Sequence, residues 1–185
     1  MQELRIQIQG HKTVSGGYSL AMPTNKTISR NRESYSLWTP VSIRYSDQDP
    51  MDHVNNVAIT AFLESGRVGL FQHIFGDMLP SRGVVLASLT VDYLNEITFP
   101  GSVEVGGMLA AFGDRSMTTH YAIFQNDTCC VLSQSVNVFF DPVRRRSTEP
   151  SSDVKAMLER YLARTGSRVA GSTRGIAEPI NTGRD

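Results

Sequence analysis

Long apolar runs are missing from this sequence. No stretch approaches the roughly 18 consecutive apolar residues of a membrane-spanning helix, so no such helix is expected. An excess of basic residues, which is typical of nucleic-acid-binding proteins, is also missing, because 18 Lys and Arg balance 18 Asp and Glu. The two cysteines, Cys129 and Cys130, are adjacent, which disfavours a disulfide between them and matches no zinc-ligand spacing. We therefore expect buried thiols in a reduced, cytoplasmic protein.

The sequence does contain enough apolar side chains for one core. Its 185 residues are 40% apolar and 19% charged, which fits one domain with short extensions. Residues 1–38 show no sustained periodicity and lack the apolar segment of a secretory signal, so we interpret them as a mobile arm. Residues 165–185 are rich in Gly, Ser, Thr and Arg, which is typical of a polar tail. The sequence thus predicts a domain over residues 39–164.

The pattern within this domain predicts one sheet and two helices. Residues 40–45 alternate as in a strand, and residues 56–74 contain no proline and follow an Asn N-cap, as in a long helix. An amphipathic helix is predicted at 151–163. Four strands separated by turn residues, which favour antiparallel pairing, are predicted at 84–95, 103–112, 117–125 and 129–140.

The long predicted helix carries small side chains on one face. Ala58, Ala61, Ser65 and Gly69 recur at three- to four-residue spacing, so we expect a sheet to lie close against them. One strand, a long buried helix, four antiparallel strands and a last helix indicate an α+β protein. A long sheet that wraps around such a helix is the hotdog arrangement.

Ionisable residues concentrate in the segment just before the long helix. Asp47, Asp49, Asp52 and His53 lie within seven positions. An EF-hand loop does not fit, because Met51 takes a ligand position and Asp52 the position of the required glycine. A carboxylate that faces a helix N-terminus suits acyl transfer, since the free N–H groups polarise a carbonyl while the carboxylate attacks it or activates water. Aspartates also form turns and caps, and the spacing alone leaves both interpretations open.

This segment resembles a known family signature. Asp-Gln-Asp-Pro-Met-Asp-His-Val-Asn-Asn at residues 47–56 is similar to Asp-x-Asp-x-x-Gly-His-Val-Asn-Asn of hotdog acyl-CoA thioesterases of the 4-hydroxybenzoyl-CoA thioesterase type. Residues 62–67 look like the aromatic-x-Glu-x-x-Arg of the family's central helix, and residues 140–142 like the end of its last strand. The resemblance covers about residues 41–163. Asp52 stands where the family usually has glycine, a position that Asp tolerates better than most residues if φ is positive.

The resemblance implies roles for individual residues. Asp49 would be the catalytic carboxylate, acting as nucleophile or as general base toward water. The backbone N–H of Asn56, at the helix N-terminus, would polarise the thioester carbonyl. Tyr45 matches a tyrosine that relatives place near the carboxylate. Because a second hotdog clade uses a carboxylate on the helix, Glu64 stays open as an alternative.

Further residues are expected to bind the substrate. His53, Asn55 and Val57 border the predicted catalytic carboxylate and helix start, and His53 would mainly hold the loop. Arginine forks suit phosphate, so Arg115 with Ser116 and the run that begins at Arg144 are candidates for binding the coenzyme A phosphates. The run would also be consistent with a solvated charge cluster.

The expected activity is hydrolysis of an acyl-CoA to free acid and CoA, without a metal or other cofactor. The resemblance implies a homodimer or homotetramer with the substrate between subunits, and we expect a second copy to cover the edge strand before the long helix and the apolar face of that helix. A hotdog dehydratase is an alternative, but Ala58 stands where the Asp partner of His53 would be. A non-catalytic acyl-CoA-binding module is another, which the presence of Asp49 disfavours.

Overall fold

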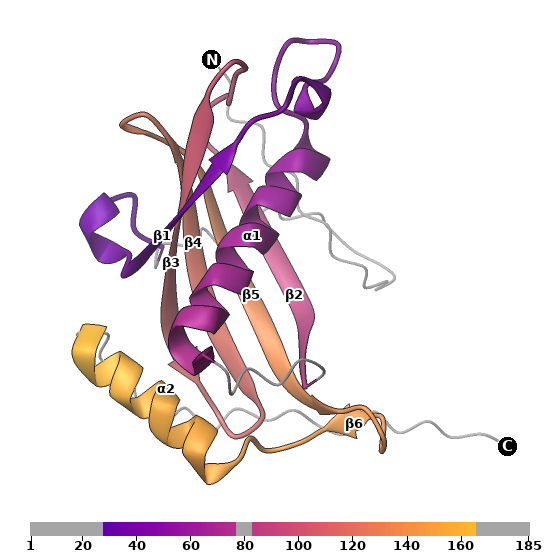
Figure 1. Ribbon diagram of the computed structural model, residues 1–185, viewed down its shortest axis with the longest axis vertical. Coiled ribbons are helices and arrows are strands. Elements are labelled where there is room, and N and C mark those ends of the chain that lie inside the picture. Colours follow the sequence, from indigo (N-terminus) through magenta and orange to yellow (C-terminus); the bar gives the residue numbers. More distant parts are fainter. Residues whose placement is uncertain (1–27, 77–82, 166–185) are drawn as a thin grey trace, which may run out of the picture.

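The computed structural model describes residues 28–76 and 83–165. Five strands form an antiparallel sheet in the order β1-β3-β4-β5-β2, and β6 pairs with the end of β5. The sheet curls around α1, as Figure 1 shows, which is the predicted α+β arrangement. In chain order the elements are η1 (Arg32–Ser34), β1 (Leu37–Ser42), η2 (Tyr45–Asp47), α1 (Asn56–Phe75), β2 (Val84–Tyr93), β3 (Ser102–Phe112), β4 (Ser116–Gln125), β5 (Thr128–Asp141), β6 (Arg146–Ser147) and α2 (Ser152–Thr165).

The helix α1 lies very close to the sheet. A Cβ atom at Gly66 would be 2.4 Å from Cγ1 of Val105, so only glycine lets the two backbones approach this closely. The small-residue face that the sequence predicts is only partly correct, because Ala58 is buried while Ala61 and Ser65 are exposed. Gly69 of that face does lie close to the sheet, because an added Cβ there would be 2.7 Å from Oγ1 of Thr39 in β1. The contact with β3 centres on Gly66, which is not among the four predicted residues.

The second helix closes one end of the core. Val154, Leu158 and Leu162 of α2 are buried in the same cluster as α1 and the inner face of the sheet. The ring of Tyr161 lies edge-on to that of His73, near the end of α1. The apolar stripe predicted for this helix therefore packs against the core, and Figure 1 shows α2 beside the C-terminal end of α1.

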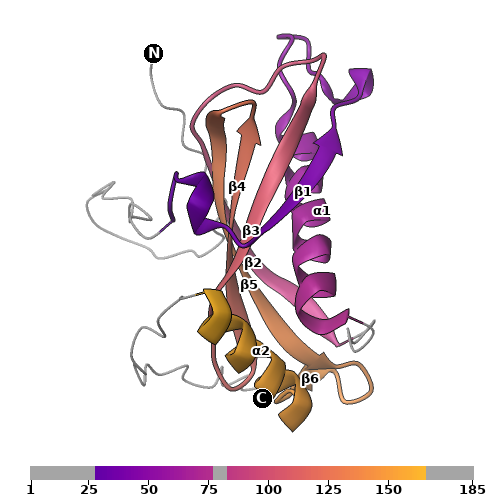
Figure 2. The ribbon, with the colours of Figure 1, turned by 60° about the vertical axis from the view of Figure 1, so that its left-hand side comes forward.

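The outer face of the sheet is covered by residues of the predicted N-terminal arm. Ile28 and Tyr35 are buried against Phe124 and Leu132, and η1 lies on the opposite side of the sheet from α1 (Figure 2). The guanidinium of Arg32 stacks 4.2 Å from the centre of the Trp38 ring. The apolar residues of this segment that pack on the sheet stand alone in the sequence, so no periodicity marks them. Residues 1–27, 77–82 and 166–185 lie outside the described residues.

Candidate active site

Asp49 lies in a tight hairpin that leads into α1. Its Oδ1 accepts hydrogen bonds from the N–H groups of Met51, at 2.8 Å, and His53, at 3.4 Å. Its own N–H donates to the His53 carbonyl at 2.8 Å. No hydrogen bond reaches Oδ2 among residues 28–76 and 83–165. The half-buried carboxylate is therefore held through one oxygen and keeps the other free.

Asp47 anchors the same loop. Its side chain is buried, at 3% residue exposure, and accepts hydrogen bonds from the backbone N–H of Arg44 at 2.8 Å and from its guanidinium at 2.9 Å. Burial alone would raise the pKa of this carboxyl, but the bonds from Arg44 outweigh it and lower the pKa. The Asp47 carbonyl also accepts from the N–H of Asn55 at 2.9 Å. Asp47 thus ties the start of the loop to the start of α1.

Asp52 and His53 complete the loop. Asp52 has a φ of 63°, the left-handed conformation in which glycine is common. His53 forms a β-bridge with Thr98, and its Nε2 lies 3.1 Å from a carboxylate oxygen of Glu96. These contacts hold the loop against the segment between β2 and β3.

The N-terminus of α1 leaves two donors uncommitted. Asn55 is the N-cap: its Oδ1 accepts from the Ala58 N–H at 2.8 Å and its carbonyl from the Ile59 N–H at 3.1 Å. Within the part of the chain that the structure describes, the N–H groups of Asn56 and Val57 have no hydrogen-bond acceptor. Such free donors at a helix N-terminus can stabilise an oxyanion.

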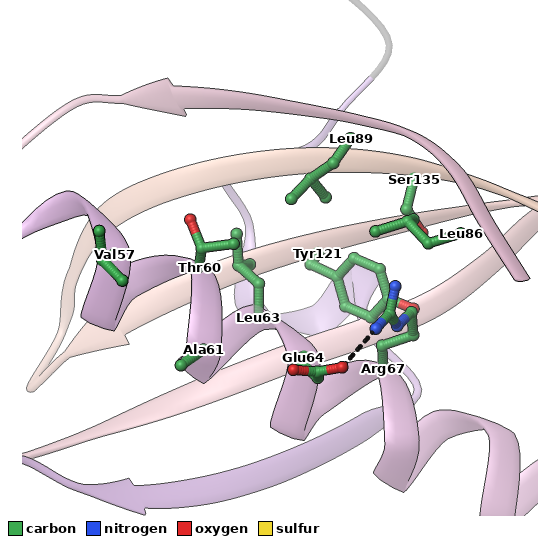
Figure 3. Close-up of a pocket in the computed structure, with 10 residues that line it drawn as sticks. All are labelled: Val57, Thr60, Ala61, Leu63, Glu64, Arg67, Leu86, Leu89, Tyr121 and Ser135. Carbon is green, nitrogen blue, oxygen red and sulfur yellow. Dashed lines mark hydrogen bonds and ion pairs between the residues drawn. The ribbon is translucent and has the colours of Figure 1, made fainter. Parts of the chain in front are cut away.

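A cavity of about 400 Å³ begins beside these donors. It runs along α1 under β2 (Figure 3), and its lining is mostly apolar. Glu64 and Arg67 border it and form an ion pair at 2.9 Å. The residues that line it are Val57, Thr60, Ala61, Leu63, Glu64, Arg67, Leu86, Leu89, Tyr121 and Ser135.

Two polar groups at the sheet side of this cavity were not anticipated from the sequence. Tyr121 and Ser135 lie in the middle of β4 and β5, where alternation marks them as inward-facing but says nothing of a cavity. Tyr121 is 1% exposed, and its hydroxyl has no hydrogen-bond partner among the described residues. Both strands contain several other polar residues, such as Ser133 and Asn137 in β5, so no sequence signal singles these two out.

The predicted phosphate-binding arginines lie elsewhere. Arg115, Arg144 and Arg146 line a second, polar cavity of about 290 Å³. It lies at the β6 end of the molecule, whereas the loop before α1 is at the other end (Figure 1). The length of α1, roughly 30 Å, separates the two ends. Ser116, predicted beside Arg115, begins β4 and is not part of this lining.

Tyr45 faces away from the core. Its side chain is 79% exposed, and its ring packs edge-on against Phe99 with centroids 6.0 Å apart. Within one chain the structure therefore groups Asp49, His53, Asn55 and the donors of the helix start, and leaves the Tyr45 ring on the surface.

Two further properties concern the described residues as a whole. They contain no group of three or more His, Cys, Asp or Glu side chains arranged to hold a metal ion. None of the helices in residues 28–76 and 83–165 is long and apolar enough to cross a membrane.

Comparison with known proteins assigns this architecture. A long antiparallel sheet that curls around a central helix is the hotdog fold, and solved thioesterases share it. Residues 43–158 match the family described as "Thioesterase-like superfamily", and the chain belongs to that family.

Individual relatives are distant. A predicted thioesterase from Bacillus stearothermophilus is 27% identical with a TM-score of 0.62, covering 67% of this chain and 94% of that one. A thioesterase from Thermus thermophilus, solved with coenzyme A and Zn, is 26% identical with a TM-score of 0.61, covering 67% and 98%. The uncharacterized protein YsmA of Bacillus subtilis (strain 168) is 29% identical over 93 residues, which are 49% of this chain and 62% of that protein.

Proposed function

We propose that this protein is an acyl-CoA thioesterase that hydrolyses its substrate to a free acid and CoA. The observation that carries the proposal is the pairing of a carboxylate anchored through one oxygen, Asp49, with the two free donors of Asn56 and Val57 in one short segment. The family supports thioester chemistry. The specific resemblance to the 4-hydroxybenzoyl-CoA thioesterase type rests on the motif at residues 47–56.

In the proposed reaction, the thioester carbonyl oxygen accepts hydrogen bonds from the helix-start N–H groups. Negative charge develops on this oxygen in the transition state, where fixed donors stabilise it most. The free Oδ2 of Asp49 removes a proton from an attacking water, or attacks the carbonyl itself to give an anhydride that water then cleaves. CoA leaves as a thiol after it gains a proton, and the acid is released.

We further propose that two copies form the site through β2. This edge strand exposes apolar side chains, with Val85 at 42% and Leu86 at 43%, whereas the other edge, β1, contains Pro40, which cannot donate to a neighbouring strand. The edge expected from the sequence is β1, so this proposal moves the contact to the opposite side of the sheet.

A two-fold contact at β2 would reunite the two groups of predicted site residues. Paired edge strands from two copies run in opposite directions, and Val84 at the start of β2 lies level with Phe139 near the end of β5. The cavity with Arg115 and Arg144 of one copy then comes to the end where the other copy carries Asp49. The three arginines there suit the phosphates of CoA, although Asp141 and Glu149 also line this cavity and Arg144 pairs with Asp141 at 3.5 Å.

A panel of acyl-CoAs, read by release of free thiol, tests this function. We expect turnover by the wild type and a loss of kcat of roughly 10²-fold or more in Asp49→Asn, with KM little changed, because the carboxylate acts mainly in the transition state. Asp52→Asn removes the same charge in the same loop and keeps a residue that tolerates positive φ, so it should remain active.

The Glu64→Gln variant decides between the two candidate carboxylates. If Glu64→Gln loses activity and Asp49→Asn does not, the helix carboxylate is the catalytic one. Binding of acyl-CoA without thiol release from any member of the panel would instead indicate a non-catalytic binding module.

A further inference from the structure

The cavity along α1 is long and has an apolar middle. It begins at Val57, whose backbone N–H is one of the two free donors, and extends to Arg67, ten residues and therefore about 15 Å along the helix. Leu63 of α1 and Leu89 of β2 lie between these two ends (Figure 3). The volume of about 400 Å³ is typical of small-molecule sites, which span about 300–1,000 Å³. A ligand held at the helix start would therefore extend along α1.

Large apolar side chains that line the cavity are exposed. Val57 is 81% exposed at the helix start, and Leu86 is 43% exposed on the edge strand β2. A ligand that lies in the cavity would cover apolar surface that is now in contact with water. Leu86 also lies on the edge at which a second copy is proposed, so a partner there would cover the cavity from that side. These exposures favour an apolar occupant.

An ion pair marks the far end of the cavity. Arg67 pairs with Glu64 at 2.9 Å, and Glu64 lies about one turn nearer to the helix start. The pair leaves no net charge to attract an anionic ligand group, and an alkyl chain that reaches it gains no further apolar contact there. The usable length thus ends between the positions of Glu64 and Arg67, which are seven and ten residues from Val57, or about 10–15 Å along the helix.

This length corresponds to an acyl chain of medium size. An extended chain advances roughly 1.2 Å per bond, since about 3.5 Å spans three bonds. The cavity therefore accommodates about nine to twelve bonds beyond the thioester carbonyl carbon. A benzoyl group, roughly 5 Å from its carbonyl carbon to the far ring carbon by the same measure, would leave half or more of this length unfilled.

We propose that the acyl group is an unbranched aliphatic chain of about ten to twelve carbons that lies along α1, with its methyl end at the Glu64–Arg67 pair. This inference rests on the proposed function, because it takes the thioester carbonyl to lie at the helix start. Leu63 is six residues beyond Val57, about 9 Å or seven bonds, so a six-carbon chain ends before it. Contact with Leu63 and Leu89 therefore distinguishes a medium chain from a short one.

Calorimetric binding of free acids, below their micelle concentrations, tests the inference without requiring turnover. Each buried methylene contributes up to about 4-fold in affinity, so we expect dodecanoic acid to bind the wild type at least about 10-fold more tightly than hexanoic acid. The four further methylenes of hexadecanoic acid should add less than about 3-fold, because they extend past the lining. Dodecanedioic acid should bind less tightly than dodecanoic acid, since its second carboxylate finds no unpaired cation.

A larger side chain at position 89 tests where the chain lies. Leu89→Trp should leave the affinity for hexanoic acid unchanged and reduce that for dodecanoic acid to the same level, because the indole would fill the middle of the cavity. Leu89→Phe, a smaller increase, should act in the same direction.

The matched control is Ser88→Trp. Ser88 is the neighbouring residue of β2, is exposed and does not line the cavity, since adjacent strand residues point to opposite faces of the sheet. This variant should keep the preference of the wild type for dodecanoic acid. Urea unfolding of the three variants shows whether each of them is folded.

Several results would overturn the inference: equal binding of hexanoic and dodecanoic acid to the wild type, a further gain of about 10-fold or more with hexadecanoic acid, tighter binding of the dicarboxylate, or a preference that survives in folded Leu89 variants or is lost in Ser88→Trp. A preference that depends on Leu89, in a protein that releases no CoA from any acyl-CoA, would support the cavity assignment and refute the proposed hydrolysis. Faster hydrolysis of benzoyl-CoA than of dodecanoyl-CoA would do the reverse, so the two proposals can fail separately.

Discussion

The side-chain oxygen of Asn55 accepts a hydrogen bond from the N–H of Ala58, three residues later, at 2.8 Å. Together with the bond from the Ile59 N–H to the Asn55 carbonyl, this cap satisfies the third and fourth N–H groups of α1 and leaves the first two free. A helix N-terminus carries a positive potential, which stabilises a nearby oxyanion. The cap therefore determines which donors are left for a substrate.

Proline at position 56 tests the role of the first donor. Asn56 is the first helical residue, where proline is tolerated, and Asn55 before it already has the extended conformation that proline requires, with φ −70° and ψ 157°. Asn56→Pro should fold normally and lose roughly 10²-fold or more in kcat, since one oxyanion donor is deleted. Asn56→Ala keeps the N–H and should lose far less. Similar kcat values for the two folded variants would contradict the assignment.

Asp47 should make the fold sensitive to acid. Its pKa is lowered in the folded protein from the ordinary value of 3.8, so it binds protons less readily folded than unfolded. Its stabilising effect is then fully present above about pH 4 and is lost as the pH falls through its lower folded pKa. Asp47→Asn should destabilise the protein at pH 7 by about 2 kcal/mol, the scale of a hydrogen bond to a charged group.

The measurement is urea unfolding from pH 7 down to pH 2. The free-energy difference between wild type and Asp47→Asn should shrink as the pH falls below 4. A difference that stays constant over this range would show that the charge of Asp47 does not stabilise the loop.

Much of the fold could be predicted from local sequence patterns. The long helix, the four strands after it and the last helix all lie close to the expected residues, because alternation, turn residues and an Asn cap are local signals. The hotdog arrangement followed from their order, and it is confirmed.

Other features depend on contacts between distant residues. Gly66, rather than Ala61 or Ser65, meets the sheet because the rotation of α1 about its axis is set by packing against Val105. Ile28 and Tyr35 pack on the outer face as isolated apolar residues, which no periodicity could reveal.

The site shows the same division between local and distant contacts. The loop at residues 47–56 could be predicted because its hydrogen bonds are local, as between Asp49 and Met51. The cavity could not, since Leu86, Tyr121 and Ser135 come from three different strands. The distance between Arg115 and Asp49 within one chain likewise follows from strand directions rather than from any motif.

A charge on the β2 edge should disrupt the proposed dimer. Val85→Lys places a lysine on the exposed edge strand, where unpaired charges oppose strand pairing. We expect the wild type to sediment as a dimer or larger species at micromolar concentration, and the variant to shift toward about 20 kDa and lose activity. Val143→Lys adds the same charge at an 89% exposed position outside the sheet, so as the control it should leave the sedimentation of the wild type unchanged. A monomeric wild type with full activity would refute the shared site.

Gly66 tests how closely the helix must approach the sheet. Alanine favours a helix interior over glycine by up to about 1 kcal/mol, so propensity alone predicts that Gly66→Ala is stabilising. The added Cβ, however, would lie 2.4 Å from Cγ1 and 3.0 Å from Cβ of Val105, a 0%-exposed core residue that has no room to yield. Overpacking of this kind costs about 1–3 kcal/mol, which exceeds the gain in propensity, so we expect a net loss of unfolding free energy.

At Gly113 a Cβ would meet nothing within 4 Å, and Gly113→Ala should leave the urea midpoint nearly unchanged. In the Val105→Ala background, which lacks the Cγ1 that the new Cβ would strike, Gly66→Ala should cost less unfolding free energy than it does in the wild type. An equal cost in the two backgrounds would show that this contact is not the cause.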